Sequence, residues 1–186
     1  MSYVLTSGPT TEVMLKAELK AAPALRIDST ADDAAIDVQI IAAREAIEEM
    51  IGRALITQTW RLTLDDWPAG DYIELPRSPV QSVTSVTYYD TDDTSATLAS
   101  ANYTVETDPE PGRITLDYNQ DWPTTILRPA NAIQIVFIAG YGDAASDVPG
   151  PIKQALILKI RQLYEGPDNL VEAAMQSLLT NYRVHY

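Results

Sequence analysis

The stretch LITQTWRLTLDDWP, residues Leu55–Pro68, alternates between apolar and polar side chains. Its apolar residues fall on one side and its polar residues on the other, namely Ile56, Trp60, Leu62 and Leu64 against Thr57, Thr59, Arg61 and Thr63. A repeat of two predicts a half-buried strand. The strand follows the segment EEMIGRA without a linker, so a helix gives way directly to β structure near Gly52.

The segment before this strand predicts a long helix that begins after a cap at Ser29 or Thr30. An apolar stripe at helical spacing contains Ile36, Ile40, Ala43, Ile47, Met50 and Ile51. The opposite face is charged and carries Asp37, Arg44, Glu45 and Glu48, with Val38 and Ile41 among them. An extended arm, Met1–Pro9, and a short helix, Thr11–Lys20, are expected upstream.

The segment after Leu55 predicts short strands separated by turn-forming sequences. The expected strands are Ile56–Leu64, Tyr72–Leu75, Val83–Tyr89, Tyr103–Glu106, Arg113–Asp117 and Ala132–Ile138. Two helices close the chain, the first beginning near Pro151 and the second capped by Asp168. On the first of them, Ala155 and Leu158 fall opposite the main apolar face.

These patterns predict an α+β fold. We expect the N- and C-terminal helices to form a small helical bundle, with an antiparallel, meander-like or sandwich-like β subdomain inserted between them. The expected division is residues 1–54 for the arm and first helices, 55–141 for the β subdomain, and 142–186 for the last helices and tail. The first and third segments would form one structural unit.

The composition excludes some kinds of site and argues against some classes of protein. The chain of 186 residues has no Cys, which excludes disulfides and thiolate metal sites. Its formal net charge of -13 argues against a protein that grips nucleic acid by its phosphates. The charge suits either simple solubility or a surface that lets DNA pass without binding it. With no long apolar run, we expect synthesis in the cytoplasm and no membrane anchor.

Catalytic and metal-binding patterns are weak. The one histidine, His185, stands next to the C-terminus, where a catalytic triad is improbable. DTDDTS, residues 90–95, resembles the start of a calcium loop but lacks its glycine and closing glutamate, so it reads better as a hairpin turn. Asp65 and Asp66 are adjacent on a strand and point to opposite faces. We therefore expect no enzyme, no cofactor and no metal site.

An ordered series of motifs carries a resemblance to a known family. The series is DDAAIDVQIIAAREAIEEMIGRALITQTWRLTLDDWP, IELPRSPVQSVTSVTYYD, PGRITL, WP and VFIAGYGDAASDVPGPIKQAL, collinear from about Asp32 to Tyr164. It closely resembles the head–tail connector (adaptor) family of long-tailed bacteriophages, with relatives in prophages and gene transfer agents. The resemblance implies a structural virion protein at the head–tail interface. It would form a ring, typically dodecameric, beneath the portal protein. The stopper or tail protein would bind to this ring, and dsDNA would pass through it without specific binding.

The resemblance also suggests roles for particular residues. The C-terminal segment of such proteins commonly reaches the portal, which here points to Tyr182, Arg183, Val184, His185 and Tyr186. Neighbour contacts are expected from Val38, Ile41, Ala155 and Leu158. An acidic loop would face the channel or its rim and repel DNA, either the one with Asp90, Asp92 and Asp93 or the segment ETDPEPG, residues 106–112.

Two other classes of protein stay open at this stage. One is a β-rich tail or baseplate binding module without affinity for a portal. The other is a carboxylate hydrolase with an unrecognised site, which would need two acidic side chains that converge in a concave pocket.

Overall fold

A computed structural model describes residues 1–21 and 33–184. Within those ranges the chain forms four α-helices and eight strands, and the strands lie in two antiparallel sheets. The expected α+β class is confirmed. The predicted helix cap at Ser29 or Thr30 lies outside the described residues.

The described chain divides into two compact units. A β unit contains Met1–Gly8 and Thr57–Gly140, and a helical unit contains Pro9–Ile56 and Tyr141–Val184. The N-terminal arm, which the sequence grouped with the helices, is instead a strand of the β unit, because its backbone pairs with the strand that begins at Gln58.

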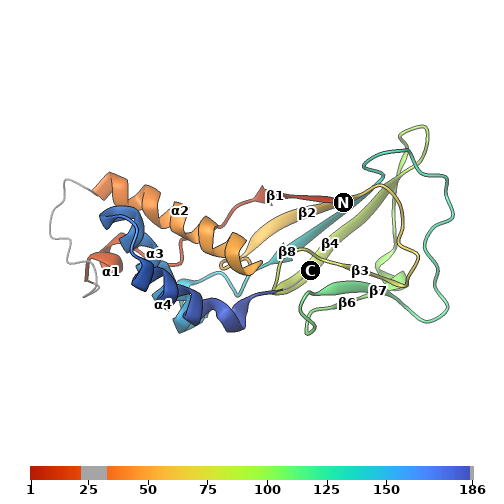
Figure 1. The fold of residues 1–186 in the computed structure, drawn as a ribbon. Coiled ribbons are helices and arrows are strands. Elements are labelled where there is room, and N and C mark those ends of the chain that lie inside the picture. Colours follow the sequence, from red (N-terminus) through yellow and green to blue (C-terminus); the bar gives the residue numbers. More distant parts are fainter. Residues whose placement is uncertain (22–32, 185–186) are drawn as a thin grey trace. The chain divides into compact units, whose positions relative to one another are not determined.

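The helical unit is built from both ends of the chain. Its helices are α1 (Lys16–Ala21), α2 (Asp33–Ile51), α3 (Gly150–Glu165) and α4 (Asn169–Leu179). Figure 1 shows α2, in orange, beside the blue helices α3 and α4. Their apolar faces enclose a core that includes Ile36, Ile40, Ala43, Ile47, Ile152, Leu156, Ile160, Met175 and Leu179. The predicted helical bundle is therefore present.

Local chemistry explains where these helices begin and end. Gly52 closes α2 with a φ of 71°, a left-handed conformation that glycine adopts without steric cost. At the start of α4, Asp168 Oδ1 accepts from the backbone N–H of Leu170 at 2.8 Å and of Val171 at 3.4 Å. Asp168 therefore satisfies amides that have no partner within the helix.

The larger sheet of the β unit has the order β1–β2–β8–β4–β5. Its strands are β1 (Ser2–Ser7), β2 (Gln58–Leu64), β8 (Ile133–Ala139), β4 (Val80–Tyr89) and β5 (Ser95–Thr97). The order differs from a sequential meander, because the last strand of the chain, β8, lies between β2 and β4. This central position explains its buried residues Ile133, Ile135, Phe137 and Ala139.

The smaller sheet has the order β3–β7–β6 and contains β3 (Tyr72–Glu74), β7 (Arg113–Leu116) and β6 (Tyr103–Glu106). Ile73 and Ile114 pair across it and are buried. On β6 and β7, the Glu106 carboxylate accepts from the Arg113 guanidinium at 2.9 Å and also from the Thr115 hydroxyl.

A membrane-crossing helix is not found in the described part of the chain, since no helix there is both long and apolar enough.

Candidate assembly surfaces

Helix α2 and the residue just before α1 present an exposed apolar surface, which we call the α1–α2 patch and define by Leu15, Val38 and Ile41. Val38 is 66% exposed, and the other two side chains are also open to solvent. Leu15 and Ile41 line one shallow cavity of about 280 Å³. Beside it, Lys16 Nζ donates to Asp37 Oδ2 at 2.9 Å, and this bond raises the pKa of Lys16. The patch thus combines apolar contact area with a charged rim.

The charged face predicted for α2 is wrong at two positions. Arg44 and Glu48 are buried, because the segment before α1 and the turn after α2 cover them. Arg44 donates to Glu12 and to Glu48, each at 2.9 Å, and Glu48 Oε1 accepts from the backbone N–H of Leu55 at 2.8 Å. Burial lowers the pKa of Arg44, but the carboxylates of Glu48 and Glu12 outweigh it and raise that pKa.

The interface residues predicted on α3 lie deeper than expected. Ala155 is fully buried and belongs to the core of the helical unit, so it is not available at the surface. Leu158 is half-buried and packs against the same core. The reason is that α3 contacts both α2 and α4, which bury a wider arc of the helix than one neighbour would.

The predicted docking tail is partly held by its own chain. Tyr182 packs against the helical core, and its carbonyl accepts from Arg53 Nε. The Val184 N–H donates to the Ile51 carbonyl at 2.9 Å, which satisfies a free carbonyl at the end of α2. Arg183 is exposed. His185 and Tyr186 lie outside the described residues.

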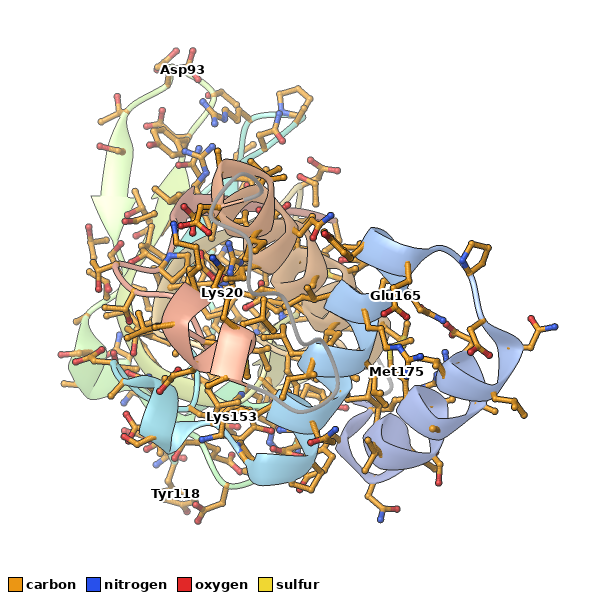
Figure 2. The ribbon with its side chains drawn as sticks, turned by 90° about the vertical axis from the view of Figure 1, so that its left-hand side faces the viewer. Lys20, Asp93, Tyr118, Lys153, Glu165 and Met175 are labelled. Carbon is orange, nitrogen blue, oxygen red and sulfur yellow. The ribbon has the colours of Figure 1, made fainter. Side chains whose placement is uncertain are left out.

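The acidic loop is the turn of the β4–β5 hairpin, as the sequence predicted. Asp90 Oδ1 accepts from the backbone N–H groups of Asp92 and Thr94, each at 2.9 Å. Asp92 and Asp93 are exposed, and Figure 2 shows Asp93 at the outer tip of the hairpin. Arg128 Nη1 donates to Asp93 Oδ1 at 3.0 Å. Asp90 therefore shapes the turn, Asp93 is paired, and Asp92 carries the outward charge.

A long connection, residues 117–132, contacts the hairpin through Arg128 and also packs against the loop after β2, although its sequence predicts only turns. Trp122 stacks on Trp67 with ring centroids 4.9 Å apart, and its Nε1 donates to the Gly70 carbonyl. Asp65 Oδ1 accepts from the backbone N–H of Asn131 at 2.7 Å. The sequence contains a Trp-Pro motif in each of the two loops, which was the available signal for this contact. The sequence alone does not show that the two loops meet.

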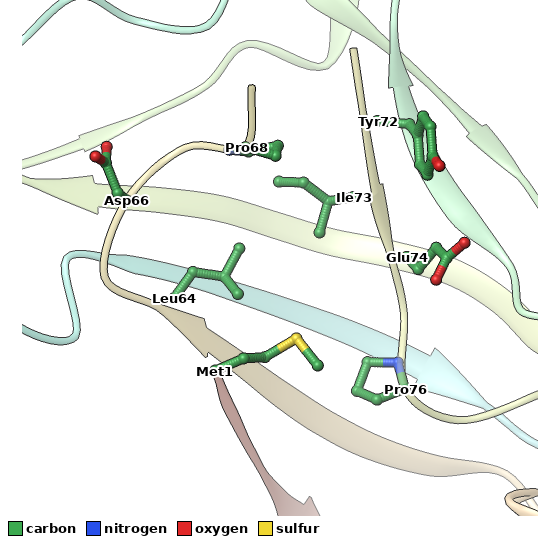
Figure 3. A pocket seen from close by; sticks show the side chains of 8 residues that line it. All are labelled: Met1, Leu64, Asp66, Pro68, Tyr72, Ile73, Glu74 and Pro76. Carbon is green, nitrogen blue, oxygen red and sulfur yellow. The ribbon is translucent and has the colours of Figure 1, made fainter. Parts of the chain in front are cut away.

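A cavity of about 340 Å³ lies in the β unit and is lined mainly by apolar side chains. Figure 3 shows Asp66 and Glu74 on opposite sides of it, with Leu64 and Ile73 between them. Asp66 accepts from the N–H of its neighbour Trp67. Hydrolysis by a pair of acidic side chains requires both carboxylates to converge on one point. The carboxylates of Asp66 and Glu74 do not converge in this way. Within residues 1–21 and 33–184, no cluster of three metal-ligating side chains is found.

Solved structures of gene transfer agent (GTA) particles contain similar chains. A chain from the neck of an empty GTA particle, computed with C6 symmetry, is 27% identical and has a TM-score of 0.85. A chain from the virion of a native GTA particle is 27% identical with a TM-score of 0.83, and one from a native neck computed with C12 symmetry is 25% identical with a TM-score of 0.82. Each match covers 100% of this chain and 97% of the other. No curated protein matches the chain.

A family model described as phage gp6-like head-tail connector protein matches residues 18–111, which include α2, the helix-to-strand junction and most of the β unit. This match agrees with the resemblance carried by the ordered motifs and with the likeness to particle necks over the whole chain. The chain belongs to the phage gp6-like head–tail connector family, and its role is that of a structural connector.

Proposed function

We propose that the chain closes into a ring at the neck of a phage-like particle, between the head and the tail. The portal would bind one side of the ring and a stopper or tail protein the other, with dsDNA passing through the centre. The main observation in support of the ring is the α1–α2 patch. An exposed apolar surface is more typical of a protein that binds a partner than of one that stays a monomer. Family membership and the likeness to neck chains with C6 and C12 symmetry support the same role.

Ring closure needs two different surfaces on each subunit, because head-to-tail contacts join unlike patches. The α1–α2 patch supplies one. The second is an exposed apolar set near the turn from α3 to α4, which we call the α3–α4 patch and define by Leu163, Tyr164 and Leu170. In this arrangement Val38 and Ile41 meet the α3–α4 patch of the next copy. Each contact is modest, and closure of the ring raises the effective concentration of all of them.

The test is the mass of the protein in solution, measured by light scattering, alone and mixed with the portal protein of the same particle. The wild type is expected to form a closed ring in at least one sample. Val38→Asp places a carboxylate in the α1–α2 patch beside Asp37 and should abolish the ring. Ile126→Asp is the matched control, because Ile126 is an exposed isoleucine in a loop of the β unit. It should leave the ring intact.

Three results would count against this role. A wild-type monomer that ignores the portal would favour a β-rich binding module instead. A ring that survives Val38→Asp would exclude the α1–α2 patch as the contact. Loss of the ring in both variants would show that the effect is not specific to the helical unit.

The portal contact is assigned to the end of the chain. Arg183 is exposed at the end of the described tail, and Arg is a residue that commonly anchors interfaces. His185 and Tyr186 extend this segment. Removing residues 185–186 and changing Arg183→Ala should weaken retention by the portal without changing the ring. Unchanged retention would move the portal contact elsewhere.

The hairpin turn is assigned to the channel or its rim, where its charge would keep DNA from binding. Asp92 is the residue to test, because it is exposed, whereas Asp93 is paired with Arg128 and Asp90 shapes the turn. Asp92→Lys should slow DNA ejection or leave DNA bound to the ring. Normal ejection in that variant would remove the turn from the channel.

A further inference from the structure

We infer that β1 forms a second contact between ring neighbours, in which it adds to the free edge of β4 in the next copy and makes the large sheet continuous between subunits. This inference rests on the proposed ring. It names backbone pairing in the β unit as a contact separate from the apolar patches of the helical unit.

The first observation is the open edge itself. Among the described residues, β1 ends the large sheet and pairs only with β2, and all six of its residues are exposed. Free edges are normally protected by proline, charge or a covering segment, because their unpaired N–H and C=O groups attract other strands. The strand SYVLTS has no proline and no charge, and its one irregularity lies at its end, between Leu5 and Ser7.

The second observation is that the apolar face of the sheet is unfinished at this edge. The register places Tyr3 opposite Leu62 and Leu5 opposite Trp60, so all four share one face. Leu62 is fully buried, whereas Tyr3 is 38% and Leu5 44% exposed. The ring centroids of Tyr3 and Trp60 lie 5.8 Å apart. The apolar layer therefore continues to β1 and stops there with two large side chains half open.

The third observation is a matching free edge on the far side of the same sheet. β5 pairs with β4 only along Thr87–Tyr89. In the described part of the chain, the preceding stretch Val80–Ser85 pairs with β8 on one side and with no strand on the other. Gln81, Ser82 and Thr84 on this stretch are exposed. It is as long as β1, and it ends just before Thr87–Tyr89, the part of β4 that pairs with β5.

Strand direction makes these two edges compatible. Every pair from β1 through β2 and β8 to β4 is antiparallel, so β1 and β4 run in opposite directions. Rotation about a ring axis that places the edges side by side therefore brings β1 of one copy antiparallel to β4 of the next. This contact joins unlike edges, as a ring requires. Pairing of β1 with another β1 would stop at a dimer, unlike the C6 and C12 symmetry of the similar necks.

Disulfide trapping tests this contact cleanly, because the chain has no cysteine. Val4→Cys is made alone and is combined in turn with Ser82→Cys, Thr84→Cys and Ser85→Cys, which samples neighbouring registers. Paired strands bring Cβ atoms to about 4.5–5.5 Å, close to disulfide range. Val4→Cys with Tyr118→Cys is the matched control, because Tyr118 is strongly exposed but lies outside both edges. Mild oxidation is applied to the protein alone and with the portal, and the mass of each unoxidised sample is measured in parallel.

The expected result is a ladder of covalent multimers for at least one of the three pairs, up to the size of the ring, and no ladder for the control. A ring by mass with no ladder from any pair overturns the β1–β4 contact and leaves the proposed function standing. Covalent dimers from Val4→Cys alone, with nothing larger from the pairs, overturn it in favour of β1 pairing with itself. A sample without a ring and without a ladder, with or without the portal, overturns both the contact and the proposed ring.

Discussion

Each unit of the molecule contains an arginine–carboxylate pair, and the two pairs differ in burial rather than in geometry. In the helical unit, Arg44 meets Glu48 at 2.9 Å, with side chains 5% and 7% exposed. In the β unit, Arg128 meets Asp93 at 3.0 Å, with side chains 24% and 75% exposed. Nearly equal distances thus accompany very different surroundings. The buried pair is part of what lets α2 fold against its neighbours, whereas the exposed pair orders a loop tip.

The largest effect expected from this comparison is that of Arg44→Ala. Breaking a buried ion pair by removing one partner costs up to about 3–5 kcal/mol. Here Glu48 would keep its backbone donor, Leu55, but lose the Arg44 guanidinium, and Glu12 would lose the same partner. Urea unfolding of purified protein measures the loss.

Arg161→Ala is the control for Arg44→Ala, because Arg161 forms an exposed pair with Glu165 on α3 at 2.7 Å. Exposed helical pairs of this kind contribute little to stability, because solvent screens them. If Arg44→Ala costs no more than Arg161→Ala, the buried pair does not have the role given to it here.

The double variant Arg44→Met, Glu48→Gln tests whether the charges of the buried pair account for its effect on stability. It removes both charges together, while a glutamine at position 48 can still accept from the Leu55 N–H. Replacing a buried pair by uncharged groups is often neutral, whereas breaking it is not. The double variant should therefore be more stable than Arg44→Ala in the same urea experiment. A double variant as unstable as the single one would mean that the arginine acts through shape rather than charge.

In the β unit, the turn residue Asp90 should matter more than the paired Asp93. Asp90→Ala removes two hydrogen bonds to the backbone of the turn, and we expect a loss of about 1 kcal/mol because the freed N–H groups can bind water. Asp93→Asn weakens one exposed ion pair and should cost less than about 1 kcal/mol. Urea unfolding of the two variants gives the order. The reverse order would make the exposed pair the main support of the hairpin.

Local sequence chemistry predicted the parts of the fold that neighbours along the chain decide. Gly52 and Asp168 mark helix ends because their caps use atoms within a few residues. The alternation after Leu55 predicted strand β2, and Trp60 and Leu62 lie on its buried side as predicted. These features depend on spacing that is visible in the sequence.

Features that depend on distant partners could not be predicted in this way. Arg44 has the spacing of a surface residue on α2, and its burial depends on Glu12 and Glu48 together. The same limit applies to β8, whose place between β2 and β4 depends on long-range pairing. Of the candidate interface residues, Val38 and Ile41 are exposed, as an interface requires, but Ala155 is not, because α3 has neighbours on two sides.

The smallest predicted effect is one of pH on the half-buried pair between Glu106 on β6 and Arg113 on β7. The side chains of Arg113 and Thr115 donate to the Glu106 carboxylate and hold its pKa below the usual value of 4.5. A lowered pKa in the folded state stabilises the fold above the unfolded value, and this contribution is lost as the pH falls through the lowered pKa. Glu106→Gln removes the titrating group. The difference in melting temperature between wild type and Glu106→Gln should therefore be constant near neutral pH and change only below about 4.5, where the wild type loses its advantage.

Thr115→Val separates the two donors to Glu106, because it removes the hydroxyl and leaves the guanidinium in place. Its melting temperature should show a pH dependence between those of the wild type and Glu106→Gln, since the Arg113 bond is the larger cause of the lowered pKa. Solvent screens this pair, so the shift should be smaller than any loss from the buried Arg44 pair. A difference between wild type and Glu106→Gln that stays constant down to acidic pH would show that the carboxylate's charge contributes nothing to holding β6 against β7.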